Sequence, residues 1–94
     1  MKVRTSPDAE EDIREVFDYI ARDSLQNAHV VAGRIIEAID DLAVFEGRGR
    51  KGEVDGTLER VVPRTGCVVI YRVTEDEVLI LRVWRSARGA ARLS

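Results

Sequence analysis

The sequence predicts an α+β domain in which an antiparallel meander sheet packs against a two-helix hairpin. Three observations support this prediction. Two segments of the first half have apolar residues at helical spacing, Leu58–Val62 reads as a short strand, and two apolar runs, Cys67–Val73 and Val78–Trp84, are joined by a short acidic break. With an opening strand at Lys2–Thr5, the predicted order is β-α-α-β-β-β. The chain is short enough that residues 1–94 are expected to form one domain.

The first predicted helix runs from Pro7 to about Arg22. Ser6 is a residue type that caps helix N-termini, and Pro7 suits the first helical position. Acidic residues crowd the first turns, where the helix dipole favours negative charge; they are Asp8, Glu10, Glu11 and Asp12. The apolar stripe that follows consists of Ala9, Ile13, Val16, Phe17 and Ile20.

The second predicted helix begins after Ser24, which is again an N-cap residue type. Its apolar stripe consists of Ala28, Val31, Ala32, Ile35, Ile36, Ile39 and Leu42. Because the link between the helices is short, they should form an antiparallel hairpin. His29 lies at the edge of the stripe without a second His or Cys at ligand spacing, so we expect a surface or boundary residue.

The segment Glu46–Gly56 is predicted to be a loop, since four of its eleven residues are glycine. It should expose three cations, Arg48, Arg50 and Lys51. Its glycine spacing matches neither a dinucleotide-binding fingerprint nor a phosphate-binding loop. No cofactor is therefore expected.

Composition excludes several classes of protein. The single cysteine, Cys67, lies in an apolar strand, so neither a disulfide framework nor a cysteine metal site is expected. No apolar stretch approaches the roughly 20 residues of a membrane helix. The N-terminal residues turn acidic at once and lack the apolar core of a signal peptide, so we expect a cytoplasmic protein.

Charge is distributed unevenly along the chain. Residues 1–47 hold 5 Lys and Arg against 11 Asp and Glu, a net of −6, whereas residues 48–94 hold 10 against 6, a net of +4. This asymmetry indicates an acidic helical side and a basic sheet side. A basic sheet margin is suited to an acidic partner.

The last two strands carry the arginines that matter most. Strand alternation places Arg72 and Arg82 out of step with the apolar residues beside them, so both can face away from the helices. Trp84 shares the parity of Arg82 and can be either a core residue or a contact. The two arginines can either meet a partner or pair across strands with acidic residues of this chain. Those acidic residues are Glu59, Glu75 and Glu77.

These elements, in this order, resemble the ParE/RelE superfamily of toxins from type II toxin–antitoxin systems over nearly the whole chain, Val3 to Arg88. The ParE branch is the more similar one. The motifs that carry the resemblance are Ser6-Pro7-Asp8-Ala9, Asp18-Tyr19-Ile20, Gly49-Arg50, Arg60, Tyr71-Arg72-Val73, Leu81-Arg82-Val83-Trp84 and Arg88.

The resemblance implies a function and partners. It implies a toxin that inhibits DNA gyrase by binding, that is neutralised by a cognate ParD-like antitoxin of the ribbon–helix–helix type, and that meets DNA only through this antitoxin. The residues expected to contact target or antitoxin are Arg50, Arg60, Arg72, Arg82, Trp84, Arg85 and Arg88.

Two alternatives stay open. A RelE-like, ribosome-dependent messenger-RNA interferase would need a general base, a general acid and cations around the scissile phosphate. Arg85 stands where many ParE-like relatives carry His, and no Tyr follows the last strand, so no catalytic residue and no metal ligand is predicted. The other alternative is a non-toxic module that only binds an antitoxin.

Overall fold

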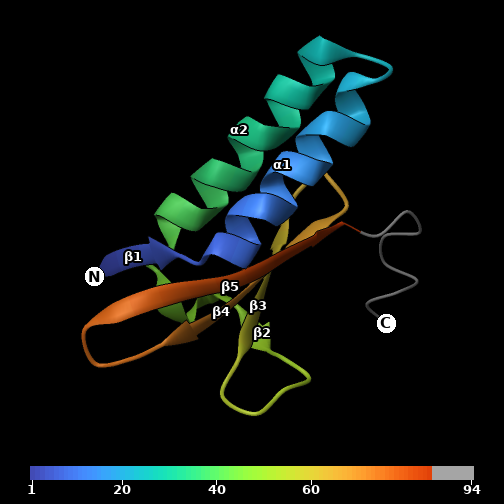
Figure 1. Cartoon of the computed structure of the whole chain (residues 1–94). Coiled ribbons are helices and arrows are strands. Elements are labelled where there is room, and N and C mark those ends of the chain that lie inside the picture. Colours follow the sequence, from blue (N-terminus) through green and yellow to red (C-terminus); the bar gives the residue numbers. More distant parts are fainter. Residues whose placement is uncertain (86–94) are drawn as a thin grey trace.

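A computed structural model describes residues 1–85 and has the predicted order of elements, with one short strand added (Figure 1). The elements are β1 (Lys2–Thr5), α1 (Pro7–Ala21), α2 (Leu25–Asp41), the 3-10 helix η1 (Glu46–Arg48), β2 (Arg50–Lys51), β3 (Leu58–Val62), β4 (Cys67–Val73) and β5 (Glu77–Arg85). Neither helix of the described residues has the length and apolar character needed to cross a membrane.

The strands form one sheet in the order β1-β5-β4-β3-β2. The meander β3-β4-β5 is antiparallel, as predicted. The sheet as a whole is mixed, because β1 runs parallel to β5 and pairs Lys2 with Glu77 and Thr5 with Ile80. Two residues of the predicted loop also pair with β3 and form β2. A strand this short has no alternation that a sequence pattern could reveal.

Both helices lie side by side on one face of the sheet (Figure 1). Helix α1 packs over β5, and α2 packs over β3 and β4. The apolar stripes predicted for the helices supply their half of the core, except for Ile36, which is 50% exposed. Alternate residues of the strands supply the other half. The largest fully buried side chains of this core are Tyr71, Ile35, Leu42, Ile80, Val62, Val69, Val78 and Val83.

Ser6 joins the first helix to the last strand. Its hydroxyl oxygen accepts a hydrogen bond from the Ala9 N–H at 3.0 Å, which confirms it as the N-cap of α1. The same hydroxyl donates to the Leu81 carbonyl at 2.9 Å, and the Ser6 N–H donates to the Ile80 carbonyl at 2.9 Å. The start of α1 is therefore attached to β5 just where β1 ends.

A β-bulge lies in β5 at Leu81. Tyr71 of β4 pairs with Ile80, but the preceding residue, Ile70, pairs with Arg82, so Leu81 is an extra residue in β5. The bulge changes which residues of β5 face the helices: Ile80 and Val83 are both buried although they are three residues apart. Beyond the bulge, Arg82 and Trp84 therefore face away from the helices.

Asp12 covers the edge of β5 beyond β1. Its carboxylate accepts hydrogen bonds from the Val83 N–H at 2.9 Å and from Nε and Nη2 of Arg82 at 2.7 and 2.8 Å. The Asp12 side chain is only 9% exposed. The bonds from Arg82 hold the pKa of Asp12 below its ordinary value, although burial acts in the opposite direction.

Asp12 was predicted only to supply negative charge near the start of the helix, and this prediction was incomplete. Asp12 lies three residues after Ala9 and four before Val16, and both of these are buried. A carboxylate on the buried stripe of a helix requires a partner. The position of Asp12 between Ala9 and Val16 is therefore the sequence pattern that could have predicted a partner for its carboxylate.

Tyr71 anchors the segment that leads into β2. Its hydroxyl donates to the Glu46 carbonyl at 2.8 Å and accepts from the Gly49 N–H at 2.9 Å. A Cβ atom on Gly49 would meet the Tyr71 ring and would lie 2.8 Å from the Glu59 carbonyl oxygen. Gly49 is therefore required by close packing, which connects the Gly49-Arg50 motif to the Tyr71-Arg72-Val73 motif.

We predict that Asp12→Asn lowers the free energy of unfolding at pH 7 by about 2 kcal/mol, because hydrogen bonds to a charged group contribute more than neutral ones. Solvent screening moderates the loss, since the Arg82 side chain is 43% exposed. Urea unfolding measures this difference. Glu11→Gln is the matched control, one residue before Asp12 in the helix. It removes an exposed ion pair with Arg14 and should change stability little.

We also predict how the stability difference between the wild-type chain and the Asp12→Asn variant depends on pH. Because the pKa of Asp12 is lowered in the folded chain, its contribution is complete above the unfolded value of about 3.9 and is lost as the pH falls through the folded pKa. The stability difference between wild type and D12N should therefore shrink between pH 5 and pH 2. A difference that stays constant over this range would contradict the role of the charged carboxylate.

We predict that Tyr71→Phe lowers the free energy of unfolding by roughly 1–3 kcal/mol, because it leaves the Glu46 carbonyl and the Gly49 N–H without a partner in a partly buried site. Tyr19→Phe removes a hydroxyl from an exposed side chain and should be neutral. Thermal or urea unfolding of both variants tests the difference. Equal effects of the two substitutions would show that the hydroxyl of Tyr71 does not anchor the segment.

Candidate functional site

The pairing register divides the predicted contact residues between the two faces of the sheet. In β4, Cys67, Val69 and Tyr71 face the helices and belong to the core, whereas Val68, Ile70 and Arg72 alternate with them and face away. Residues directly opposite each other on paired strands share a face. The partners of each β4 residue therefore show on which face they lie.

The face away from the helices carries an apolar centre with cations around it. Val61, Val68 and Trp84 form one row across three strands, in which Val68 is buried and Val61 is exposed. Glu59, Ile70 and Arg82 form the next row. Trp84 is 48% exposed, and the Arg82 guanidinium lies 5.9 Å from the centroid of its ring. We call this surface the outer sheet face; it consists of Arg50, Glu59, Val61, Val68, Ile70, Arg72, Leu79, Arg82 and Trp84.

The arginines of the outer sheet face differ in how they are held. Arg72 is exposed, as predicted, and forms no ion pair with other residues of the described part of the chain. Arg50 pairs with Glu59, its neighbour across strands β2 and β3, at 3.4 Å. Arg82 turns over the edge of β5 to Asp12.

Of the two alternatives left open for Arg82, pairing across strands with Glu59, Glu75 or Glu77 does not occur. Asp12 instead accepts hydrogen bonds from Nε and Nη2 of Arg82. Glu77 pairs instead with Arg4 of the neighbouring parallel strand at 2.7 Å, and this lowers the pKa of Glu77. Neither the parallel pairing of β1 nor the approach of α1 to β5 could be read from local spacing.

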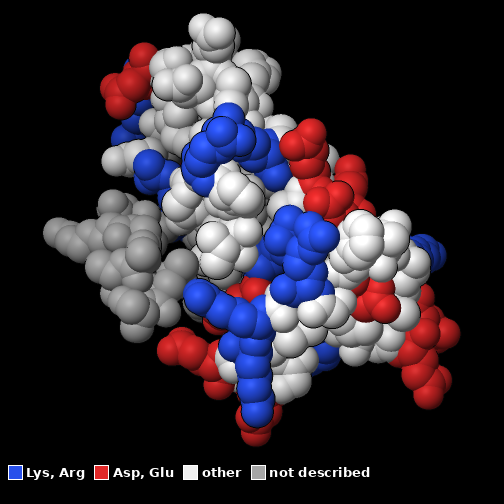
Figure 2. Space-filling view, turned by 180° about the vertical axis from the view of Figure 1, so that it is seen from behind, with Lys and Arg blue, Asp and Glu red and all other residues white. Residues whose placement is uncertain are grey.

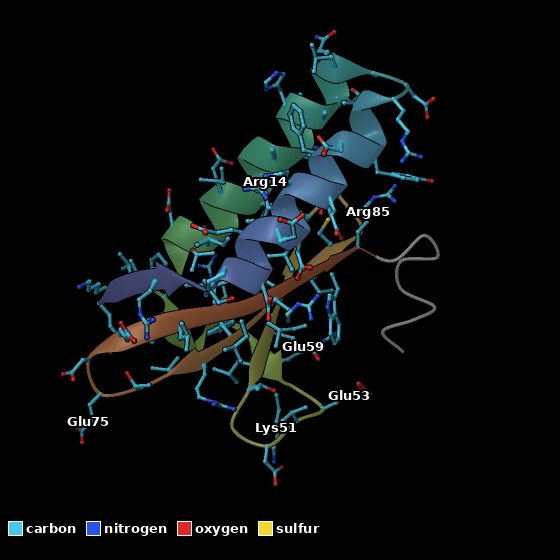
Figure 3. All side chains as sticks on the ribbon, in the orientation of Figure 1. Arg14, Lys51, Glu53, Glu59, Glu75 and Arg85 are labelled. Carbon is cyan, nitrogen blue, oxygen red and sulfur yellow. The ribbon has the colours of Figure 1, made fainter. Side chains whose placement is uncertain are left out.

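Two predicted contact residues lie on the helix side of the sheet. Arg60 is opposite Val69, and Arg85 is opposite Cys67, so both share a face with the core. Arg85 sits at the end of β5 next to α1, while Glu59 lies across the sheet from the helices (Figure 3). The Arg85 guanidinium stacks on Tyr19 of α1 at 4.8 Å from the ring centroid. Arg88 lies outside the described residues.

The residues predicted to contact a partner are thus divided between the two faces of the sheet. Arg50, Arg72, Arg82 and Trp84 come together on the outer sheet face, and Arg60 and Arg85 do not join them. Lys and Arg side chains also form a band across the face of the molecule that Figure 2 shows, with acidic side chains gathered along one margin. Cations are thus presented on more than one surface.

Three side chains that could transfer protons, those of His29, Cys67 and Tyr71, lie away from the outer sheet face. His29 packs edge-on against Phe17 between the helices, with ring centroids 5.0 Å apart. Cys67 is buried, as predicted, and burial raises the pKa of its thiol. The Tyr71 hydroxyl is occupied by its two backbone partners. Residues 1–85 contain no cluster of His, Cys, Asp or Glu that could hold a metal ion.

The fold defines a class of protein, the RelE/ParE-type toxins. The chain is similar to a structure of the chromosomal ParDE toxin–antitoxin system from P. aeruginosa, with a TM-score of 0.83, 25% sequence identity, and coverage of 90% of this chain and 95% of that one. The toxin–antitoxin complex RelBE2 from Mycobacterium tuberculosis has the same fold, with a TM-score of 0.64 and 22% identity over 90% of this chain and 96% of that one.

The family is given by the sequence model described as "ParE toxin of type II toxin-antitoxin system, parDE", which matches residues 3–89. The chain belongs to this family. It is also 34% identical over 62 residues to the protein named "Putative toxin Y4kP" of Sinorhizobium fredii (strain NBRC 101917 / NGR234). That match covers 66% of this chain and 65% of the relative's length. The predicted resemblance to the ParE branch is confirmed.

Proposed function

We propose that this toxin inhibits DNA gyrase by binding it through the outer sheet face, without chemistry of its own. The observation that carries the proposal is the composition of that face: a half-exposed Trp84 stands beside cations on a rigid sheet. Tryptophan and arginine are the residue types that contribute most to protein–protein binding. Gyrase as the target rests on membership in the ParE family.

A binding role accounts for the side chains better than RNA cleavage does. Cleavage through a 2′-hydroxyl needs a base and an acid positioned around the phosphate. Glu59 on the outer sheet face is paired with Arg50. Glu77, on the same side of the sheet, is paired with Arg4. Arg82, which could stabilise a phosphorane, is already bound to Asp12. The fold shared with RelBE2 is therefore not accompanied by a visible acid–base pair in residues 1–85.

We further propose a cognate antitoxin as the regulating partner. The similarity to a ParDE system supports a ParD-like antitoxin of the ribbon–helix–helix type, which would hold the toxin inactive in the cytoplasm. DNA would then be met only through the antitoxin. The net charge of −2 agrees with this arrangement, because proteins that bind nucleic acid directly are basic as a rule.

Gyrase supercoiling in the presence of the purified chain tests the proposal. The wild-type chain should inhibit supercoiling and stabilise cleavage complexes, and Arg72→Glu and Trp84→Ala should each weaken inhibition at least tenfold, since both remove contacts from the outer sheet face. Arg14→Glu, an exposed substitution on α1, is the control and should inhibit normally. Unfolding curves of all variants separate lost binding from lost folding.

The same experiment distinguishes the alternatives. Normal supercoiling together with cuts in ribosome-bound messenger RNA would overturn the proposal in favour of a RelE-like interferase. Normal supercoiling with uncut messages would leave a non-toxic module that only binds an antitoxin. Inhibition that is unchanged in both outer-face variants would retain gyrase as the target and reject the outer sheet face as the contact.

A further inference from the structure

We propose that a groove on the helix side of the sheet binds a carboxylate side chain of a partner protein. The groove has a volume of about 210 Å³ and lies between α2 and β3. We call it the α2–β3 groove. It is separate from the outer sheet face, because Arg60 is opposite Val69 and faces the helices. Its charged and turn residues are Arg34, Glu37, Asp41, Arg60, Pro63 and Arg64.

Arg60 is the residue proposed to bind the carboxylate. Its side chain is only 17% exposed, and its Nε is buried without a hydrogen-bond partner among the described residues. Buried donors without acceptors are rare in folded proteins, since each costs about 1–3 kcal/mol. The one ion pair of Arg60 is long, 3.7 Å from Nη2 to the half-exposed Asp41 carboxylate. The fold therefore keeps this arginine buried and leaves part of its hydrogen-bonding capacity unused.

Two further arginines converge on the same groove. Arg34 of α2 reaches the Arg64 carbonyl with a long hydrogen bond of 3.4 Å, so its other donors are available. Arg64 itself has φ = 60°, a left-handed backbone conformation that is uncommon for a residue other than glycine. Such strain is concentrated at functional sites. It places Arg64 at the groove, in the turn that follows β3.

The charges and size of the groove indicate its ligand. Three guanidinium groups face two carboxylates, those of Glu37 and Asp41, so the lining carries a formal charge of +1. An arginine with a free Nε and a loosely held Nη can turn toward an incoming carboxylate and bind it in the bidentate geometry that gives the strongest such pairs. A volume of about 210 Å³ suits one acidic side chain and not a whole helix.

We assign this acidic side chain to the antitoxin, an identification that rests on the proposed function. The carboxylate would leave water for a site where its charge is matched, which makes the contact specific as well as favourable. The groove lies on the opposite side of the sheet from Trp84. An antitoxin bound here could therefore occupy the toxin independently of the surface proposed to meet gyrase.

Titration with sodium acetate tests the groove without any partner. The ¹H–¹⁵N cross-peak of Arg60 Nε should shift with increasing acetate and saturate, whereas that of Arg14, exposed on α1, should change no more than in sodium chloride of equal ionic strength. An Arg60 signal that does not move, or that moves only as Arg14 does, would overturn the proposal.

The antitoxin complex provides the second test, with a candidate ParD-like antitoxin as the ligand. Arg60→Met should weaken its binding by about 30-fold or more, as expected when one member of a buried charge pair is truncated. Arg60→Lys should recover part of this loss, and Arg14→Met should bind within twofold of wild type. The melting temperature of R60M should be unchanged or higher, because the substitution removes an unpaired buried donor.

The outcomes separate the two proposals. If wild-type chain and R60M bind the antitoxin equally well, the groove is not the contact, although the antitoxin remains a partner. If the wild-type chain does not bind that protein at all, the proposed antitoxin is wrong, and the acetate titration alone decides whether the groove is a carboxylate site. A large loss of stability in R60M would indicate a structural role and would also reject the proposal.

Discussion

The structure depends on the carboxylate of Asp12, which binds the part of the β5 edge that β1 does not cover. β1 covers only the first half of β5, so the second half would leave its backbone edge open beneath α1. Asp12 accepts hydrogen bonds from two successive residues of that edge, Arg82 and Val83. Together with Ser6, whose hydroxyl donates to the Leu81 carbonyl, Asp12 joins the start of α1 to β5. Because these bonds are charge-assisted and the Asp12 carboxylate is largely shielded from water, they fix the second half of β5 against α1.

Because Asp12 binds Arg82, the arginines of the sheet differ in how free they are to bind another molecule. Arg82 is committed to Asp12 and holds its neighbour Trp84 in place, so it supports the outer sheet face more than it offers a free charge. Arg72 stands exposed on the same face. Arg60 is buried on the other side with only a long ion pair. A chain with little excess charge thus carries cations on both sides of the sheet, because only some of its arginines are used internally.

The fold of this chain is shared with proteins of very different sequence. RelBE2 from Mycobacterium tuberculosis has the same fold at 22% identity, so the helix pair and the sheet tolerate extensive substitution. What a member of the superfamily does depends on the side chains placed on the sheet, since fold alone does not specify function. Here the outer sheet face combines Trp84, Val61 and Arg72, a composition suited to gripping a protein surface.

The sequence by itself determined what depends on neighbours along the chain. Two N-caps, two apolar stripes and the antiparallel meander were predictable, because capping and side-chain periodicity act within a few residues. Only the tertiary structure decided the parallel place of β1, the bulge at Leu81, the partner of Arg82 and the side on which Arg60 lies. The longest-range of these features join residues 70 or more positions apart, as Asp12 and Arg82 are and as Lys2 and Glu77 are, and no local pattern encodes such a pairing.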